Sequence, residues 1–259
     1  MPGILDGVND IIDKALGLDF KAKTPLYGHK TACQRLTSES PRDFDGRLLI
    51  ETIYGQIENS DRREKSPSKQ NWRWYPNPKI DPENDSPEVR LERAIVALPG
   101  NGWANQIPTA SGLVNEHLDK TRNIDLVHWC KDGWYEFLEL KVESNTPLFA
   151  AMEILQYGIL YIFSRAYRVA LGYRPHENPL LYGEGVHLKV LAPEDYYKDR
   201  GELYKLEWLE KKINDGLQVF LSEPKWGFDM RFSFESFRDK EDLLKNPAKN
   251  RSRVYPMSS

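Results

Sequence analysis

The chain has 259 residues, with 36 basic and 39 acidic side chains and a formal net charge of −3 at pH 7. This length is enough for one large domain or two small ones with a sizeable hydrophobic core. The charge argues against a general nucleic-acid coat protein, so any nucleic-acid contact would depend on a local patch or a bound metal.

The first predicted element is a helix from Ile4 to Leu16, where apolar residues recur at helical spacing and Gly17 supplies a stop. Its other face is acidic, with Asp6, Asp10 and Asp13, which argues against binding to an anionic membrane. We expect this helix to pack on its own domain. Docking to a second subunit, which would give a homodimer, is the alternative.

No segment of the sequence predicts export or membrane insertion. The N-terminus lacks the basic region and cleavage site of a signal peptide. The longest apolar run, Leu148 to Phe163, is interrupted by Glu153 and Gln156 and is too short and too polar for a spanning helix. Only two cysteines are present, Cys33 and Cys130, without disulfide or zinc spacing, so we expect a cytoplasmic protein.

Residues 1–85 are expected to form an N-terminal extension that packs on the core. Residues 20–46 have no clear pattern and are expected to be irregular, whereas Arg47 to Ile57 predicts a strand. A charged loop from Asn59 to Lys69 follows, and the proline-rich stretch Pro76 to Pro87 is a connector.

Basic and aromatic residues alternate near the end of this extension. The loop carries Arg62, Arg63, Lys65 and Lys69, and the next residues include Trp72-Arg73-Trp74-Tyr75. Such a pattern can grip a nucleic-acid backbone and stack on bases. The alternative, which we favour, is a solvated loop that leads into a buried aromatic strand.

A regular succession of elements predicts the core, residues 86–240. Ser86-Pro87-Glu88 starts a helix that runs to about Leu98, and Glu92 lies inside its apolar stripe. The further expected elements are a short strand near Gln106-Ile107, strands Asn123–Cys130 and Trp134–Glu143, a helix from Thr146 to about Ala170, a strand Val186–Ala192, a helix Glu202–Asp215 ended by Gly216, and a strand Met230–Phe237. The order predicts an α/β fold, followed by a polar basic tail, residues 241–259, that frays at its end.

The turn between the two central strands decides whether their acidic residues meet. Side chains alternate along a strand, so Glu139 and Lys141 share one face. A three-residue turn, Lys131-Asp132-Gly133, places Asp125 opposite Glu139, whereas a two-residue turn points the two acids apart. Glycine at the third position favours the longer turn. The same register puts Ile124 and Leu126 on the side of Leu138 and Leu140, where we expect the core.

Two neighbouring carboxylates and a lysine indicate metal-dependent chemistry. The carboxylates repel each other, and a hard divalent cation relieves the repulsion. Ligand oxygens suit Mg²⁺ or Mn²⁺ rather than zinc. Lys141 can hold a water or balance charge on a phosphoryl group. A surface ion pair on a half-exposed sheet is the alternative for an acid–x–lysine triplet taken alone.

The helix after the hairpin carries one polar face in an otherwise apolar segment. Glu153, Gln156 and Tyr157 share this face with Leu160 and Ser164. Gln156 either satisfies backbone at the sheet edge or orients the lysine or a phosphate, and both interpretations stay open. Gly158 permits close approach of a neighbouring element.

These residues together resemble the PD-(D/E)XK nuclease superfamily, over about Ser86 to Ala192. The resemblance implies a restriction-endonuclease-like α-β-β-β-α-β core, with a mixed central sheet flanked by helices. It implies that Asp125 and Glu139 bind Mg²⁺ and that Lys141 assists the attacking water. Glu92 matches a glutamate on the first core helix as a third ligand, and Gln156 matches a supporting glutamine on the next helix.

The leading hypothesis is therefore a Mg²⁺- or Mn²⁺-dependent nuclease that hydrolyses phosphodiester bonds, in DNA by preference. Two alternatives remain: a non-catalytic module of the same fold that binds nucleic acid or a protein, and an assembly protein that docks through its N-terminal helix. His128 is expected to be a satisfied core histidine rather than a ligand, and Cys130 lacks the setting of a thiol nucleophile.

Overall fold

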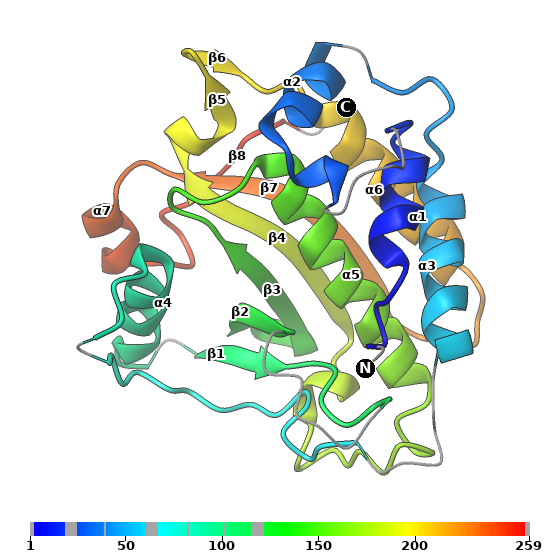
Figure 1. Cartoon of the computed structure of the whole chain (residues 1–259). Helices are drawn as coiled ribbons and strands as arrows, with labels where there is room; N and C mark the ends of the chain where they lie inside the picture. Colours follow the sequence, from blue (N-terminus) through cyan, green and yellow to red (C-terminus); the bar gives the residue numbers. More distant parts are fainter. Residues whose placement is uncertain are drawn as a thin grey trace.

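A mixed six-stranded sheet runs through the centre of the computed structural model, which describes residues 3–18, 25–38, 40–60, 67–81, 83–100, 102–114 and 122–256 (Figure 1). The strands follow the spatial order β1, β2, β3, β4, β7, β8. The pairs β3–β4 and β4–β7 are parallel, and the other pairs are antiparallel. The strand bounds are β1 Trp103–Pro108, β2 Asn123–Trp129, β3 Trp134–Leu140, β4 Gly185–Pro193, β7 Asp229–Phe237 and β8 Ser252–Arg253, and β5 Lys198–Asp199 pairs with β6 Glu202–Leu203 in a separate hairpin.

The predicted α/β class is confirmed, and the core elements follow the expected α-β-β-β-α-β order. Helix α4 (Pro87–Ala97) precedes β1, and helix α5 (Pro147–Ala166) joins β3 to β4. Both helices begin where the sequence predicts. The hydroxyl of Ser86 accepts the amide N–H of Val89, and that of Thr146 accepts the amide N–H of Phe149.

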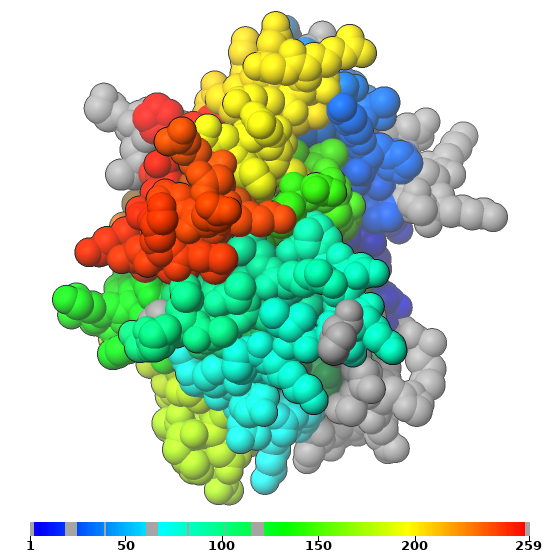
Figure 2. Space-filling model, turned by 90° about the vertical axis from the view of Figure 1, so that its left-hand side faces the viewer, coloured from blue at the N-terminus to red at the C-terminus, as the bar shows by residue number. Residues whose placement is uncertain are grey.

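Helices cover both faces of the sheet (Figure 1). One face packs against α5 and α6 (Glu207–Leu221), with α1 (Val8–Ala15) and α3 (Gly46–Ser60) outside them, and encloses the larger hydrophobic core. The other face packs against α4 and α7 (Lys240–Lys245) around a smaller core. Figure 2 shows this second side, where α7 in orange lies next to α4 in blue-green.

The central hairpin has the predicted register. Leu126 pairs with Leu138 and Trp129 with Tyr135, so the same ladder places Asp125 opposite Glu139. The connection Lys131–Gly133 is a single 3₁₀ turn in which both Asp132 and Gly133 have positive φ. One part of the expectation is wrong: Leu126 joins the smaller core with Leu138, but Ile124 joins the larger core on the opposite side.

The region before the core is more helical than predicted. Helix α2 (Lys30–Ser38) lies within the stretch expected to be irregular. The expected strand at residues 47–57 is instead part of α3, whose buried Ile50, Ile53 and Ile57 recur at helical spacing. Arg62, Arg63 and Lys65 lie outside the described residues. Within the described residues, α1 and α3 lie against each other, and α3 contacts α5 and α6.

One prediction near the C-terminus is wrong. The helix expected at residues 202–215 begins at Glu207 and continues through Gly216 to Leu221, because Gly216 fits against the backbone of α3 at Gly46. The polar tail is ordered up to residue 256, where it forms α7 and β8, and the side chain of Arg251 is only 5% exposed. The fraying expected at the end of the tail falls on residues 257–259, which lie outside the described residues.

Helix α5 forms the centre of the larger core. By length and composition alone it would be able to cross a membrane, contrary to the expectation, but 89% of its most apolar window is buried inside the protein. Its Gly158 permits the predicted close approach, since a Cβ there would lie 2.4 Å from Leu188 Cδ1 of β4. Asp13 of α1 is not on an exposed acidic face. It is buried and accepts the amide N–H groups of Leu26 and Tyr27, both at 2.8 Å.

Candidate active site

Asp125 and Glu139 come together at the end of the β2–β3 ladder. The partly buried carboxylate of Asp125 accepts the amide N–H of Leu140 through Oδ2, at 2.9 Å. Glu139 is buried on the next strand. Burial raises the pKa of Asp125 to about 6 against the opposing charge of Lys141. Burial also raises the pKa of Glu139, and the negative charges of Asp125 and Glu153 add to the effect.

Lys141 bridges two carboxylates. Its Nζ lies 2.5 Å from Glu139 Oε1 and 3.1 Å from Glu153 Oε2, and the side chain is only 9% exposed. Its amide N–H donates to the carbonyl of Leu191, which fixes the backbone beside β4. Burial acts to lower the pKa of Lys141, but the charges of Glu139, Glu153 and Asp125 outweigh burial and raise it. The ammonium group therefore stays charged and acts as a donor.

Glu92 lies close enough to influence Asp125 but has partners of its own. It is buried on α4, accepts Asn105 Nδ2 at 2.8 Å and Gln106 Nε2 at 2.6 Å, and pairs with Arg93 Nε at 3.1 Å. Burial raises its pKa to about 7 despite the bond from Gln106, and the charge of Asp125 contributes. Gln106 holds its amide there from a backbone with a φ of 51°, a conformation rare outside glycine.

The two central carboxylates suit a hard cation. One oxygen of Glu139, Oε2, is buried and has no hydrogen-bond partner among the described residues. A buried carboxylate oxygen without a donor is costly unless something positive binds it. The atoms that could act as metal ligands here are carboxylate oxygens, which favour Mg²⁺ or Mn²⁺ over zinc. Within the described part of the chain, however, Glu92, Asp125 and Glu139 do not form a set of ligand atoms all within 4.8 Å of one another.

Gln156 does not point its amide at Lys141. Its Nε2 donates to the hydroxyl of Tyr27 at 3.3 Å and to the carbonyl of Met152 at 3.2 Å. The polar face of α5 instead presents Glu153 to the lysine. Next to this contact is a cavity of about 90 Å³ between α5 and the N-terminal region, which is lined by Asn9, Pro25, Tyr27, Arg122, Phe149, Glu153, Gln156 and Tyr157.

Two residues of the site, Glu153 and Tyr27, were not predicted as site residues from the sequence. Glu153 was signalled only as the first polar residue of the α5 face that also holds Gln156. Tyr27 gave no signal, since it lies far from the core in sequence and reaches Gln156 only through the fold. Burial raises the pKa of Tyr27 well above its usual value, so its hydroxyl stays protonated.

A second polar cluster lies on the α4 side of the sheet. His128 Nδ1 is 3.0 Å from Glu136 Oε2 and 3.7 Å from Cys130 Sγ, and these three side chains have the spacing of a metal site. Glu136, however, already binds Lys189 Nζ at 2.5 Å and Arg251 Nη2 at 2.8 Å. These two cations disfavour a bound metal ion, and His128 is held by a carboxylate as a partly buried histidine.

The pKa values in this second cluster agree with an ion-pair network. Burial acts to raise the pKa of Glu136, but the bond from His128 and the charges of Arg251 and Lys189 outweigh it, so the pKa is lowered. Burial raises the pKa of the Cys130 thiol to about 11, with the charge of Glu136 adding to the effect. A protonated thiol is neither a good nucleophile nor a good metal ligand.

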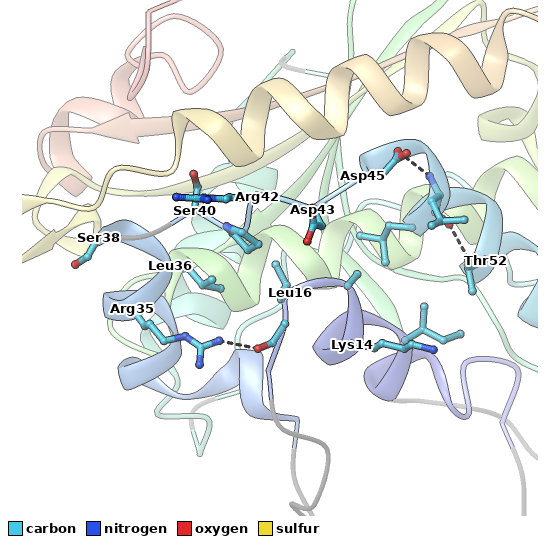
Figure 3. Close-up of a pocket in the computed structure, with 16 residues that line it drawn as sticks. Lys14, Leu16, Arg35, Leu36, Ser38, Ser40, Arg42, Asp43, Asp45 and Thr52 are labelled. Carbon is cyan, nitrogen blue, oxygen red and sulfur yellow. Dashed lines mark hydrogen bonds between the residues drawn. The ribbon is translucent and has the colours of Figure 1, made fainter.

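A cavity of about 1330 Å³ lies between α1, α2 and α3, away from these residues (Figure 3). Its polar side chains serve the nearby helix ends. Asp45 accepts the amide N–H of Leu48, Thr52 donates to the carbonyl of Leu48, and Arg35 donates to the carbonyl of Gly17. None of the residues predicted for the site lines it.

No family model, curated protein or solved structure matches the chain. Its function is therefore inferred from the residues of the site themselves.

Proposed function

We propose that the protein is a Mg²⁺- or Mn²⁺-dependent nuclease that hydrolyses phosphodiester bonds, in DNA by preference. The observation that carries the proposal is the buried ion pair of Lys141 and Glu139, which lies opposite Asp125 on the strand ladder and leaves one Glu139 oxygen without a hydrogen-bond donor. The α-β-β-β-α-β order of the core supports a restriction-endonuclease-like fold, in which such a triplet has this role.

Each residue has a part that follows from its contacts. Asp125 and Glu139 would hold the metal, and the Leu140 amide keeps one oxygen of Asp125 in place. A bound Mg²⁺ would polarise the phosphoryl group and acidify a coordinated water. Lys141 would donate to the attacking water or to a phosphate oxygen, as a charged group rather than a base.

Glu92 and Gln156 have supporting parts in the proposal. Glu92 would act as the third carboxylate beside the metal, oriented by Asn105 and Gln106. Gln156 would act through Tyr27, holding the N-terminal region against the polar face of α5. Both parts would tune the site rather than perform the chemistry.

The decisive test is cleavage of DNA and RNA by the purified protein with Mg²⁺, with Mn²⁺ and with a chelator. The matched pair of variants is Lys141→Met and Lys189→Met. Lys189 is equally buried, and its Nζ lies 2.5 Å from Glu136 and 2.6 Å from Glu235, on the other face of the sheet. Lys141→Met should abolish cleavage, whereas Lys189→Met should retain it if the variant folds.

Two results would reject the proposal. One is a Lys141→Met variant that cuts as fast as the wild type. The other is a wild-type protein that cuts no nucleic acid with either metal; binding without turnover and without sensitivity to a chelator would then support the non-catalytic module. Glu92→Gln adds a graded test. If Glu92 is a third carboxylate at the metal, its loss should raise the Mg²⁺ concentration needed for cleavage by about 10- to 100-fold.

A further inference from the structure

An aromatic pocket lies further along the same strand ladder as the candidate site. The ladder pairs Val127 with Phe137 and Trp129 with Tyr135, after the position where Asp125 faces Glu139. These odd-numbered residues share one face of the sheet. Four residues of strand separate Trp129 from Asp125, which is about 13 Å.

The pocket has the size and the lining of a binding site for flat rings. Its volume is about 610 Å³, within the usual range for small-ligand sites. The described lining includes three aromatic side chains, Trp74, Trp129 and Tyr135, and Trp129 is 55% exposed, although tryptophan is highly buried on average. The rings of Trp74 and Tyr135 lie 6.2 Å apart. Among the described residues, Arg73, His176 and Glu177 also line the pocket.

The walls of the pocket are held in place by buried contacts. Trp72, next to Arg73, is completely buried and packs its ring against Phe137 and Tyr161. Asn178, beside the lining residues of the 172–183 loop, donates to the carbonyl of Asn71 at 2.7 Å. The two segments lie side by side in both whole-molecule views (Figures 1 and 2). The rings are therefore presented on a fixed support rather than on a free loop.

Charge and ring content favour a nucleic-acid strand as the occupant. Arg73 supplies a guanidinium group at the pocket and also lies over the ring of Tyr75, which is 59% exposed. Glu177 is the one acidic side chain among the described residues of the lining, and its Oε1 lies 3.5 Å from His176 Nε2. Stacking on aromatic rings beside a cation is how proteins bind unpaired bases of any sequence.

We propose that this pocket binds unpaired bases, so that the substrate is a single strand or a duplex with a single-stranded end. The inference rests on the proposed nuclease function for the identity of the polymer. A base-paired duplex keeps its base faces stacked inside the helix, so it cannot fill the pocket. The separation of about 13 Å would place the scissile bond a few nucleotides from the stacked base.

Binding by the full chain in the presence of a chelator tests this directly, because no cleavage then occurs. Fluorescence anisotropy with a labelled oligothymidine and with a labelled blunt duplex gives the two affinities. We expect the single strand to bind at least tenfold more tightly than the duplex. Trp129→Ala should weaken binding of the single strand about tenfold or more, as the loss of one stacked base requires.

Trp134→Ala is the matched control. Trp134 lies on the same strand as Tyr135, but on the opposite face, where Arg231 covers its ring. This variant should bind the single strand as the wild type does. Thermal melting of both variants checks that they fold. Arg73→Ala is a further variant at an exposed position: we expect it to weaken binding of the single strand and to make the affinity less dependent on salt concentration.

The outcomes separate this inference from the proposed function. Binding of the single strand that depends on Trp129, without cleavage under Mg²⁺ or Mn²⁺, supports the pocket and rejects the nuclease. Cleavage of single strand and duplex at equal rates, unchanged in Trp129→Ala, supports the nuclease and overturns the pocket. Failure of the wild type to bind any single strand also overturns it, and would point to a protein partner at this surface.

Discussion

The carboxylate of Asp125 accepts the amide N–H of Leu140 at 2.9 Å, so the acid on β2 is anchored to the residue between Glu139 and Lys141. The acid–x–lysine triplet therefore does two things. Its side chains act on the pKa of Asp125, and its central backbone amide fixes one oxygen of Asp125. This bond couples the hairpin register to the geometry of the site.

Asp125→Asn separates these two contributions. The asparagine oxygen can still accept from Leu140, so we expect the variant to fold and to retain most of its thermal stability. It loses one negative charge at the metal position and should lose most of the stabilisation that Mn²⁺ gives the wild type. Thermal melting with and without Mn²⁺ measures both effects. Asp132→Asn, at the exposed hairpin turn, should keep the full metal response; an unchanged response in Asp125→Asn would show that Asp125 is no ligand.

Glu153 should position Lys141 without being a ligand itself. Glu153→Ala removes one of the two carboxylates that hold the ammonium group, so the rate of cleavage should fall by about 10- to 100-fold. Glu153→Gln keeps an oxygen that can accept from Lys141 and should recover part of this loss. Substrate affinity and the Mg²⁺ requirement should change little in either variant. A loss confined to KM, with kcat intact, would place Glu153 in substrate binding instead.

The central triad was predictable because it is local. Gly133 and the alternation of β2 and β3 are enough to bring Asp125 opposite Glu139, without knowledge of the remaining fold. Glu153 and Tyr27 were missed because their roles arise from packing. Glu153 meets Lys141 only because α5 crosses β3, and Tyr27 meets Gln156 only because Asp13 fixes the segment at residues 25–28.

Helix α3 was predicted to be a strand because its helical state also depends on packing. Its isoleucines favour a strand on local propensity, and tertiary packing overrides that preference. The packing depends on two glycines, Gly46 and Gly216, which lie far apart in the sequence, so no local pattern shows that they meet. A Cβ on Gly46 would lie 2.0 Å from the carbonyl oxygen of Lys212, and one on Gly216 would lie 2.5 Å from the carbonyl carbon of Gly46. Helices α3 and α6 thus touch through their backbones.

This contact predicts a sharp difference between two glycines. Gly216→Ala must push α3 and α6 apart, because the clash is with backbone atoms, and should lower the free energy of unfolding by about 1–3 kcal/mol or more. Gly55→Ala, within α3, has open space around the new methyl group and should be neutral or stabilising by about 0.5–1 kcal/mol. Urea denaturation of both variants provides the comparison. Equal stabilities would contradict the close approach of the two helices.

His187 should make the free energy of unfolding depend on pH in the acidic range, independently of the candidate site. Its Nε2 lies 3.0 Å from Ser233 Oγ on the neighbouring strand. Burial lowers the pKa of His187 from 6.5 to about 3, helped by the charge of Lys189, with Arg253 and Arg231 acting in the same direction and Glu136 opposing. In the unfolded chain the imidazole binds a proton near pH 6.5, whereas in the folded chain it does not until about pH 3.

The neutral histidine therefore contributes stability that is fully present above pH 6.5 and is lost as the pH falls towards 3. The slope attributable to it is at most about 1.4 kcal/mol per pH unit. His187→Gln cannot titrate, so its free energy of unfolding should fall less steeply than that of the wild type over this range. His176→Gln, at an exposed position, serves as the control and should follow the wild type. Parallel curves for wild type and His187→Gln in urea titrations would show that His187 is protonated equally in both states.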